Sequence, residues 1–397
     1  MSYRIIAESS IRYPPFESSL MIPERLPSIH DEEVIAEVSH EEEAIECAEQ
    51  LLPPFRVGRK DEWFVERKII IEGPDGKQVS FKPKPKLKID SEEPPLAVEK
   101  QRTGWYLRPN PIHRHARKVV TFAVALLLIG LLFQTIEPLL VALGLLPETI
   151  FGGVRFGLLD YPFLVVYVGP LMMVPYLLRL VANVRDLKHQ REFLSDPPAQ
   201  PDILFLSPVV ADSKLHCKIN FSEPRDDWLS AKVWWQVGAL PPTREKVMEI
   251  LYKGINSQPP PGFSTPLPHY WEQGLSDGGG FGEETPLMQF DAPGGLFLRP
   301  LRMMAWGGRG SLPISGGELE LSPPTPHWPG SNHGGLAAIH WEMVIRIDRE
   351  KQGPLFWVHP IRVAHSSKLS MIEEFHINDG RIEDSIRIED DSHPIAA

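Results

Sequence analysis

The pattern of apolar and polar positions divides the chain into three regions. The middle region holds two long apolar runs, Val119–Leu146 and Phe163–Val184, joined by a short connector. A transmembrane helix needs about 20 predominantly apolar residues, and each run supplies enough of them. The pattern therefore predicts a hairpin of two transmembrane helices, covering roughly residues 119–140 and 163–182.

The N-terminal region, residues 1–90, predicts a small α/β domain of ββαββ type. Tyr3–Ala7 and Val34–Val38 have strand-like composition, whereas the segment between them contains several prolines and is expected to be irregular. Val65–Glu72 and Lys77–Phe81 flank a Gly-Pro-Asp-Gly segment, which favours a turn between two strands.

A helix is expected between these two pairs of strands. Ser39 and Glu42 fit a capping box, in which each side chain bonds a free backbone N–H at the helix N-terminus. Apolar residues then recur at helical spacing as far as Pro53, which cannot continue a helix. The acidic run Glu41–Glu43 is interpreted as a solvated first turn, where the helix macrodipole favours negative charge.

The C-terminal region, residues 196–365, predicts an antiparallel β-sandwich with long loops rich in glycine and proline. Its candidate strands are Ile203–Leu206, Lys214–Phe221, Ala231–Val237, Phe297–Met304, Gly317–Leu321, Ala338–Ile347 and Leu355–Val363. Several of them alternate apolar and polar residues, as a strand with one buried face does. This number of strands, with one helix at Thr243–Tyr252, is typical of a sandwich. Residues 366–397 are expected to form an acidic tail.

One stretch of this region is similar to part of a known fold. Glu318–Leu321 reads as a strand, Pro323–Pro326 as a proline-rich loop, and Ile339–Met343 as a strand with an aliphatic-x-Trp-x-aliphatic pattern. Residues 317–347 resemble one edge of an arrestin-like sandwich, and an immunoglobulin-like sandwich suits the same pattern. The resemblance implies a protein-binding adaptor module and no catalytic residues. No family is identified for the whole chain.

The charges around the apolar runs predict how the hairpin is oriented. Segment 91–118 is a basic juxtamembrane linker, the connector holds one basic residue, and four more surround the end of the second run. Cytoplasmic flanks carry an excess of Lys and Arg, so both termini are expected in the cytoplasm and the connector outside. The chain is thus predicted to be a two-pass protein of the cell or inner membrane. The residues expected at the membrane interface are Trp105, Tyr106, Arg114, Arg117, Lys118, Arg179 and Arg185.

Gln134 and Glu137 are the candidate polar residues within the hairpin. A carboxylate inside a membrane span is a candidate functional residue, which makes an oligomeric channel or transporter subunit one alternative function. Glu137 also lies near the outer end of the first predicted helix, and Pro138 follows it. A position at the headgroup boundary costs little, so an ordinary interfacial role is favoured.

Other candidate chemistry is sparse. His327, His333 and His340 raise a second alternative, a His-based metal hydrolase, but zinc needs three or four converging ligands and two of these residues fall in a loop. Cys47 and Cys217 are the only cysteines, which excludes a disulfide framework. The net charge of −11 argues against nucleic-acid binding. No catalytic, metal or cofactor-binding residue is predicted.

These patterns predict a multi-domain α+β membrane protein. The expected function is a membrane-anchored, non-enzymatic adaptor or scaffold that presents its cytosolic domains to an unidentified cytosolic protein. Its expected partners also include the lipid bilayer and, through a homo-oligomer, further copies of itself. The sequence leaves open whether the two cytosolic domains touch each other.

Overall fold

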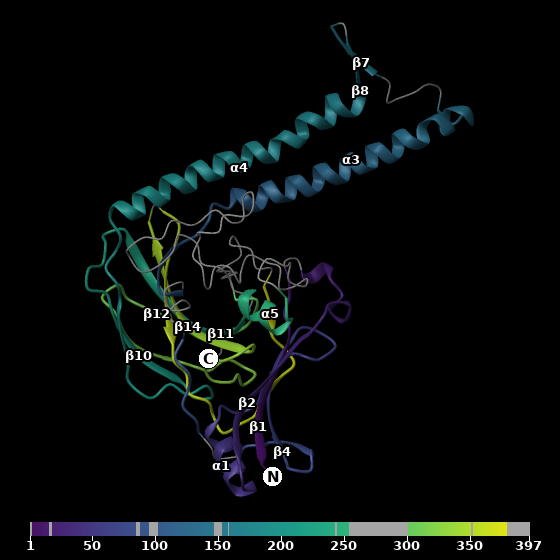
Figure 1. Cartoon of the computed structure of the whole chain (residues 1–397). Helices are drawn as coiled ribbons and strands as arrows, with labels where there is room; N and C mark the ends of the chain where they lie inside the picture. The colour runs from purple at the N-terminus through teal and green to yellow at the C-terminus, as the bar shows by residue number, and fades with distance from the viewer. Residues whose placement is uncertain are drawn as a thin grey trace. The chain divides into compact units, whose positions relative to one another are not determined.

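The computed structural model describes residues 2–15, 18–84, 88–94, 102–146, 153–157, 159–242, 244–253, 301–350 and 352–378. In this part of the chain the protein is mixed α+β and forms two compact units (Figure 1). Unit 1 combines Met1–Arg108 with Pro198–Ala397, and unit 2 is Pro109–Pro197. The two flanks of the apolar region therefore belong to one unit, and the apolar region forms the other.

The first sheet of unit 1 comes mainly from the N-terminal residues. Its elements are β1 (Tyr3–Arg12), β2 (Ile29–Val38), β3 (Phe55–Val57), β4 (Phe64–Glu72) and β5 (Gln78–Ser80), with α1 (Glu41–Gln50) and the short 3-10 helices η1 (Ser18–Leu20) and η2 (Pro23–Arg25). Among the described strands the order is β16-β3-β4-β1-β2, and β5 pairs with β4. Ala44 and Ala48 of α1 pack on Ile5 of β1 and Ile69 of β4.

The predicted strand–helix pattern of this region is confirmed, with three corrections. The segment expected to be irregular is partly ordered, because β1 and β2 pair from Tyr3 opposite Val38 as far as Ile11 opposite Ile29. The capping box is wrong: α1 begins after His40, which makes no side-chain cap hydrogen bond. Strand β3 carries too few residues for an alternating pattern and was not expected.

Two further antiparallel sheets build the rest of unit 1. The strands are β6 (Gly104–Leu107), β9 (Asp202–Phe205), β10 (Leu215–Asn220), β11 (Trp228–Leu240), β12 (Met303–Leu312), β13 (Gly317–Leu321), β14 (Ala338–Arg349), β15 (Leu355–Ile361), β16 (Ser370–Ile372) and β17 (His376–Ile377), with helix α5 (Arg244–Ile250). Within the described residues one sheet has the order β13-β10-β9 and the other β17-β12-β11-β14-β15-β6.

Most of the predicted C-terminal strands are confirmed, and the helix near residue 250 is α5. Of the strand expected at Phe297–Met304, residues 297–300 lie outside the described part, and the described strand β12 begins at Met303. The smaller sheet lies against the larger one where Trp235 Nε1 donates a hydrogen bond to the carbonyl of Ser322 at 2.7 Å. Gly310 of β12 sits so close to Leu319 of β13 that a side chain there would clash.

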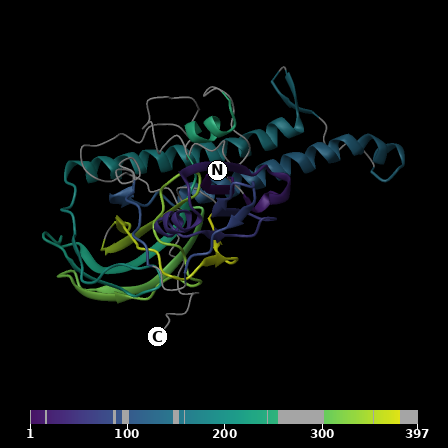
Figure 2. The same cartoon turned by 60° about the horizontal axis from the view of Figure 1, so that its bottom comes forward.

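The two flanks of the chain are interleaved rather than separate. Strand β6, from the segment expected to be a linker, pairs with β15, and β16 pairs in parallel with β3. In Figure 2 the yellow β16 lies beside the purple and blue N-terminal strands. Part of the segment expected to be an acidic tail is therefore a strand of the N-terminal sheet, and residues 379–397 lie outside the described part. The question of contact between the flanks is answered, because they share two sheets.

Unit 2 is a pair of long helices with a small hairpin between them. These are α3 (Ile112–Ala142), β7 (Gly153–Phe156), β8 (Leu159–Pro162) and α4 (Phe163–Ser195). Both helices extend beyond the predicted limits into the basic flanking segments, and α4 continues through Pro170 and Pro175. They pack side by side along their length (Figure 1).

Candidate functional site

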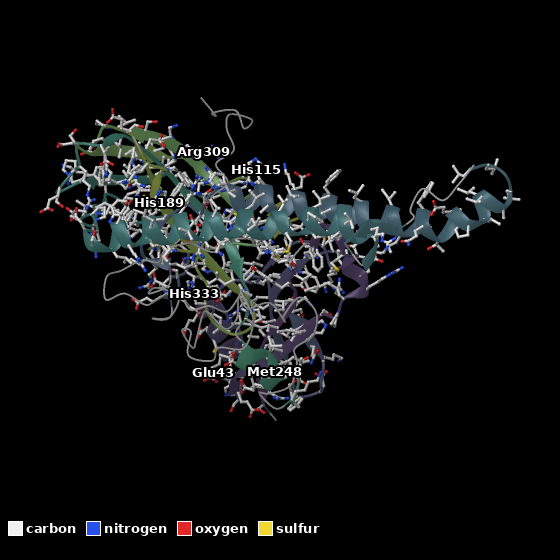
Figure 3. The ribbon with its side chains drawn as sticks, turned by 90° about the horizontal axis from the view of Figure 1, so that it is seen from above. Glu43, His115, His189, Met248, Arg309 and His333 are labelled. Atoms are coloured by element: carbon white, nitrogen blue, oxygen red, sulfur yellow. The ribbon has the colours of Figure 1, made fainter. Side chains whose placement is uncertain are left out.

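The exposed apolar surface of α3 is the first feature that points to a function. Among the described residues, α3 is the one helix long and apolar enough to cross a membrane. Leu128, Ile129 and Leu132 are each between 60% and 63% exposed, and Figure 3 shows such carbon-only side chains, drawn white, along the helices. A continuous exposed apolar face indicates contact with lipid or protein rather than water. The structure thus supplies one candidate span, and the two-pass topology stays a prediction.

The buried face of α3 follows a seven-residue repeat. Its buried residues are Ala116, Ala123, Gly130 and Glu137. A seven-residue repeat keeps one stripe of a helix facing its partner, and small residues allow two helix backbones to approach closely. Helix α4 packs on α3 and has Ala182 fully buried. This stripe, called the seam below, explains why two apolar helices stay paired.

Gln134 and Glu137, the two candidate polar residues, differ in exposure. Gln134 is exposed, whereas Glu137 is 4% exposed and lies in the seam. One turn of helix therefore separates an outward amide from an inward carboxylate. Of the two, Glu137 is the residue that helix packing has enclosed, as intramembrane carboxylates usually are.

Asp186 of α4 links the two helices at the polar end of unit 2, where α3 begins and α4 ends. Its carboxylate accepts hydrogen bonds from the backbone N–H of Asn110 at 3.1 and 3.3 Å and lies 2.9 Å from Nε2 of His113. The side chain of Asn110 in turn accepts a hydrogen bond from the N–H of Ile112, at the start of α3. Asp186 is largely buried, so it fixes the beginning of α3 to the last turns of α4.

The predicted interfacial cations gather at this end of both helices. Lys118, Arg179 and Arg185 are exposed, and Arg114 and Arg117 are partly buried. Lys188 and Arg191 extend the set along α4. Figure 3 labels His115 of α3 and His189 of α4 in the same stretches. We call the following residues the basic collar: Arg114, Arg117, Lys118, Arg179, Arg185, Lys188 and Arg191.

Trp105 and Tyr106 do not lie at a membrane interface, so this part of the prediction is wrong. Both belong to β6 and are almost fully buried in the core of unit 1. Trp105 donates a hydrogen bond from Nε1 to the carbonyl of Pro198 at 3.0 Å and packs edge-on against Trp357. An aromatic pair beside an apolar helix suits an interface and a core equally well, and here the pairing of β6 with β15 decides for the core.

A second candidate site is a network of buried polar side chains in unit 1. Arg102 donates two hydrogen bonds to Glu342, from Nε to Oε2 at 2.5 Å and from Nη2 to Oε1 at 2.6 Å. Gln236 donates to Oε1 of the same carboxylate at 2.5 Å, and its own oxygen accepts from Nε1 of Trp234 at 3.1 Å. Both charged side chains are essentially inaccessible to solvent. Bidentate hydrogen bonding of this kind is what compensates two buried charges.

The pKa values of this pair keep both charges in place. Burial opposes ionisation of Glu342, but the charge of Arg102 and the hydrogen bonds from His340 and Arg102 outweigh it and hold the pKa of Glu342 far below its usual range. Burial also opposes the charge on Arg102, yet Glu342 raises the pKa of Arg102. A carboxylate held ionised in this way is a poor proton donor or acceptor. The pair therefore ties the segment before α3 to β14.

Two histidines continue the network towards the surface. His340 Nε2 lies 3.3 Å from Glu342 Oε2, and His340 Nδ1 lies 3.3 Å from His333 Nε2. Burial lowers the pKa of both histidines, that of His333 to about 3, so both are neutral at pH 7. Glu92 ends the chain of contacts by accepting hydrogen bonds from the backbone N–H groups of His333 and Gly334 at 2.6 and 2.5 Å.

The three histidines considered as metal ligands do not form a common site. His327 Nε2 instead lies 3.0 Å from the hydroxyl of Ser366. In the described part of the chain no group of three or more His, Cys, Asp or Glu side chains is arranged to hold a metal ion. The pairing of His333 with His340 is therefore part of the buried network, and a His-based metal hydrolase has no structural support among these residues.

The sequence pattern does not predict Arg102, Gln236 or Glu342 as a cluster. One signal was present: Glu342 interrupts a strand in which the residues on both faces, such as Trp341 and Val344, are apolar. A lone carboxylate in a strand buried on both faces requires a partner. Asp186 has a similar signal, because it is an isolated acid within a basic stretch of α4.

Comparison with known proteins assigns no family. No family model matches the chain, and no curated protein matches it. This agrees with the sequence patterns, which identify no family for the whole chain. In the stretch that resembles an arrestin-like edge, β13 and β14 belong to different sheets, so the proline-rich loop between them crosses from one sheet to the other.

Proposed function

We propose that the chain is a two-pass integral membrane protein that holds unit 1 in the cytoplasm as a non-enzymatic adaptor or scaffold. The observation that carries this proposal is the composition of unit 1. Residues before α3 and after α4 fold into one unit and share sheets. A chain that enters the membrane through α3 must therefore return to the side from which it started, and α4 is the segment that connects back. An even number of crossings follows.

The basic collar supports the orientation. Its cations lie at the ends of α3 and α4 that connect to unit 1, whereas the connector side carries Glu148, Asp160 and one basic residue, Arg155. Excess Lys and Arg mark the cytoplasmic side of a span. Unit 1 and both termini are therefore assigned to the cytoplasm and the connector to the outside of the cell or inner membrane.

Two features of unit 1 support an adaptor rather than an enzyme. The buried ion pair of Arg102 and Glu342 holds segments of unit 1 together. Among the described strands β9 pairs with β10 alone, and Leu204 and Leu206 at this edge are 57% and 49% exposed. An open sheet edge with exposed apolar side chains is suited to binding an extended segment of a partner protein.

Cysteine accessibility tests the topology. In a background with Cys47→Ser and Cys217→Ala, a cysteine is introduced by Gly153→Cys in the connector or by Val79→Cys in unit 1, where Val79 is 65% exposed. A membrane-impermeant maleimide added to sealed cells should label the connector cysteine at once and the unit 1 cysteine only after permeabilisation. Labelling of both sites, or of neither, before permeabilisation would contradict the proposed topology.

Partner capture tests the adaptor role. The full chain and the variant Leu204→Glu/Leu206→Glu are purified from their native membrane, with Leu229→Glu as the control because Leu229 is similarly exposed on β11. The proposal expects a cytosolic protein that co-purifies with the full chain and the control and is lost from the β9 variant. If the full chain co-purifies with no partner and forms no assembly, the adaptor proposal is wrong.

Glu137 favours a second candidate function, an oligomeric channel or transporter subunit. The supporting observation is a carboxylate enclosed in the seam of an apolar helix pair. Two helices are too few to surround a transport path, so several copies would have to assemble. Ion flux in proteoliposomes that disappears in Glu137→Gln would favour this function, and unchanged flux in that variant would exclude the role of Glu137.

A further inference from the structure

The polar end of the helix pair has a charge opposite to that of the protein as a whole. The chain carries a net charge of −11, yet the basic collar contributes seven cations within two short stretches of α3 and α4. The acids in these stretches, Asp186 and Glu192, are already engaged: Asp186 by His113 and a backbone N–H, Glu192 by Lys188 at 3.7 Å. The collar is therefore a strongly positive surface on an acidic protein.

We propose that the basic collar binds the anionic headgroups of phospholipids and so selects an anionic membrane leaflet. The inference rests on the proposed membrane insertion and adds the class of lipid that the protein recognises. Lys118, Arg185 and Arg191 are exposed to a headgroup, and Lys188 is exposed beside Glu192. Arginine offers the paired donors that suit a phosphate, and lysine adds a compact positive charge.

The neighbours of these cations place them at a lipid surface. Val184 and Leu187, which alternate with collar residues along α4, are 60% and 47% exposed. Long basic side chains next to exposed apolar ones can lay their alkyl stems along the acyl region and lift their charges to the phosphates. A free phosphate ion would leave this apolar surface in water.

The contacts of Asp186 with Asn110 and His113, called the clamp below, make the collar one surface rather than two. Because Asp186 contacts both Asn110 and His113, the first turns of α3 stay beside the last turns of α4. Cations from both helices are thereby held in a fixed arrangement around the polar end. The connector sequence between the two helices holds Glu148 and Asp160 with a single cation, so the proposal expects the preference for anionic lipid at the collar side alone.

Lipid co-purification tests the inference on the full chain. The protein is reconstituted in vesicles with equal parts of phosphatidylcholine and phosphatidylglycerol, extracted in mild detergent, and its bound lipids are quantified by mass spectrometry. Phosphatidylglycerol should be enriched, and the variant Arg185→Gln/Lys188→Gln/Arg191→Gln should lower that enrichment at least about tenfold, since each basic residue at an anionic surface changes affinity about fivefold. Raising the ionic strength should lower the enrichment of the unmodified chain as well.

A matched control removes the same charge from unit 1. The variant Lys214→Gln/Lys253→Gln/Arg309→Gln loses three exposed cations outside the collar and should keep the enrichment of the unmodified chain. Equal loss in both variants, or no enrichment in the unmodified chain, would overturn the collar proposal. So would loss of the enrichment on adding inorganic phosphate at matched ionic strength, because that result assigns the site to free phosphate.

Alkaline extraction of the unmodified chain from pure phosphatidylcholine vesicles separates the proposal of membrane insertion from that of lipid selectivity. A chain that is not retained disproves the membrane function itself. A chain that is retained but shows no preference for phosphatidylglycerol disproves only the lipid selectivity.

Discussion

Unit 1 buries charges, and unit 2 exposes apolar side chains. In unit 1 the ion pair of Arg102 and Glu342 is inaccessible to solvent, while in unit 2 apolar residues such as Ile129 and Leu132 are more than half exposed. Each arrangement is costly in water unless something offsets it. In unit 1 the offset is internal and comes from hydrogen bonds, whereas in unit 2 it must come from the surroundings.

Under the proposed membrane insertion, unit 2 is the unit whose stability depends on a membrane. Hydrogen bonds within unit 1 compensate the buried charges of Arg102 and Glu342, so the stability of this unit should respond to substitutions as that of a protein folded in water does. The seam of unit 2 is narrow, and the other residues of α3 are partly or fully exposed. All ten tryptophans belong to unit 1, so their fluorescence reports the unfolding of that unit alone.

The largest expected effect comes from breaking the buried ion pair. Glu342→Ala removes the carboxylate that Arg102, Gln236 and His340 contact, and it leaves Arg102 charged and buried. This should lower the free energy of unfolding of unit 1 by about 3–5 kcal/mol. Denaturant titration followed by tryptophan fluorescence measures it. The control is Glu320→Ala, which breaks the exposed pair with Lys214 and should cost less than about 1 kcal/mol. Equal costs in the two variants would show that burial of the pair is unimportant.

The next effect compares the same substitution at an exposed leucine of each unit. Leu132 of α3 and Leu229 of β11 are both 62% exposed. Leu132→Arg should disfavour membrane insertion by roughly 2.5–3.5 kcal/mol if lipid surrounds α3, whereas Leu229→Arg should leave insertion unchanged. The fraction resistant to alkaline extraction measures insertion. If both variants are extracted to the same extent, the exposed face of α3 does not meet lipid.

The buried histidines predict a smaller effect that depends on pH. The pKa values of His333 and His340 lie below the ordinary 6.5 in the folded chain, so only the unfolded chain takes up protons as the pH falls below that value. Stability of unit 1 should therefore decline as the pH falls from 6.5 to 5, by about 2 kcal/mol for a histidine with the pKa of His333. Denaturant titrations across this range should show a shallower decline in His333→Gln/His340→Gln. The control His216→Gln, at an exposed site, should keep the full decline.

The sequence patterns predicted the elements well where a single property decided them. The strand at Gly317–Leu321 and the strand expected at Ala338–Ile347, which the structure extends to Arg349, follow from their alternation, and α3 follows from an apolar run of the right length. The predicted positions of the helix ends were less accurate, because basic residues at the start of α3 continue the helix without adding to the apolar pattern.

The candidate sites were only partly predictable. Lys118, Arg179 and Arg185 are exposed on α3 and α4, and their place at a membrane interface stays a prediction. Trp105 and Tyr106 are instead buried in unit 1, because a local pattern does not report pairing between distant strands. The same limit hid the pairing of Arg102 with Glu342, residues 240 positions apart. Local patterns report what a segment prefers, and long-range pairing decides which preference prevails.

The smallest expected effect concerns the polar end of unit 2. Asp186→Asn keeps an oxygen for the N–H of Asn110 but removes the charge beside His113, which should weaken the clamp by about 1 kcal/mol. Hydrogen exchange at the first turns of α3, measured in detergent or lipid, should then become about fivefold faster while tryptophan fluorescence stays unchanged. Glu192→Gln, which removes an exposed pair with Lys188, should change the exchange rate less than twofold, on the basis of about 0.3–0.5 kcal/mol for such helix pairs.

Because the clamp fixes the two halves of the basic collar together, Asp186→Asn should also reduce phosphatidylglycerol enrichment, although no collar cation is lost. Unchanged exchange in that variant would mean that the seam alone holds the helices, and the collar would then be two independent surfaces.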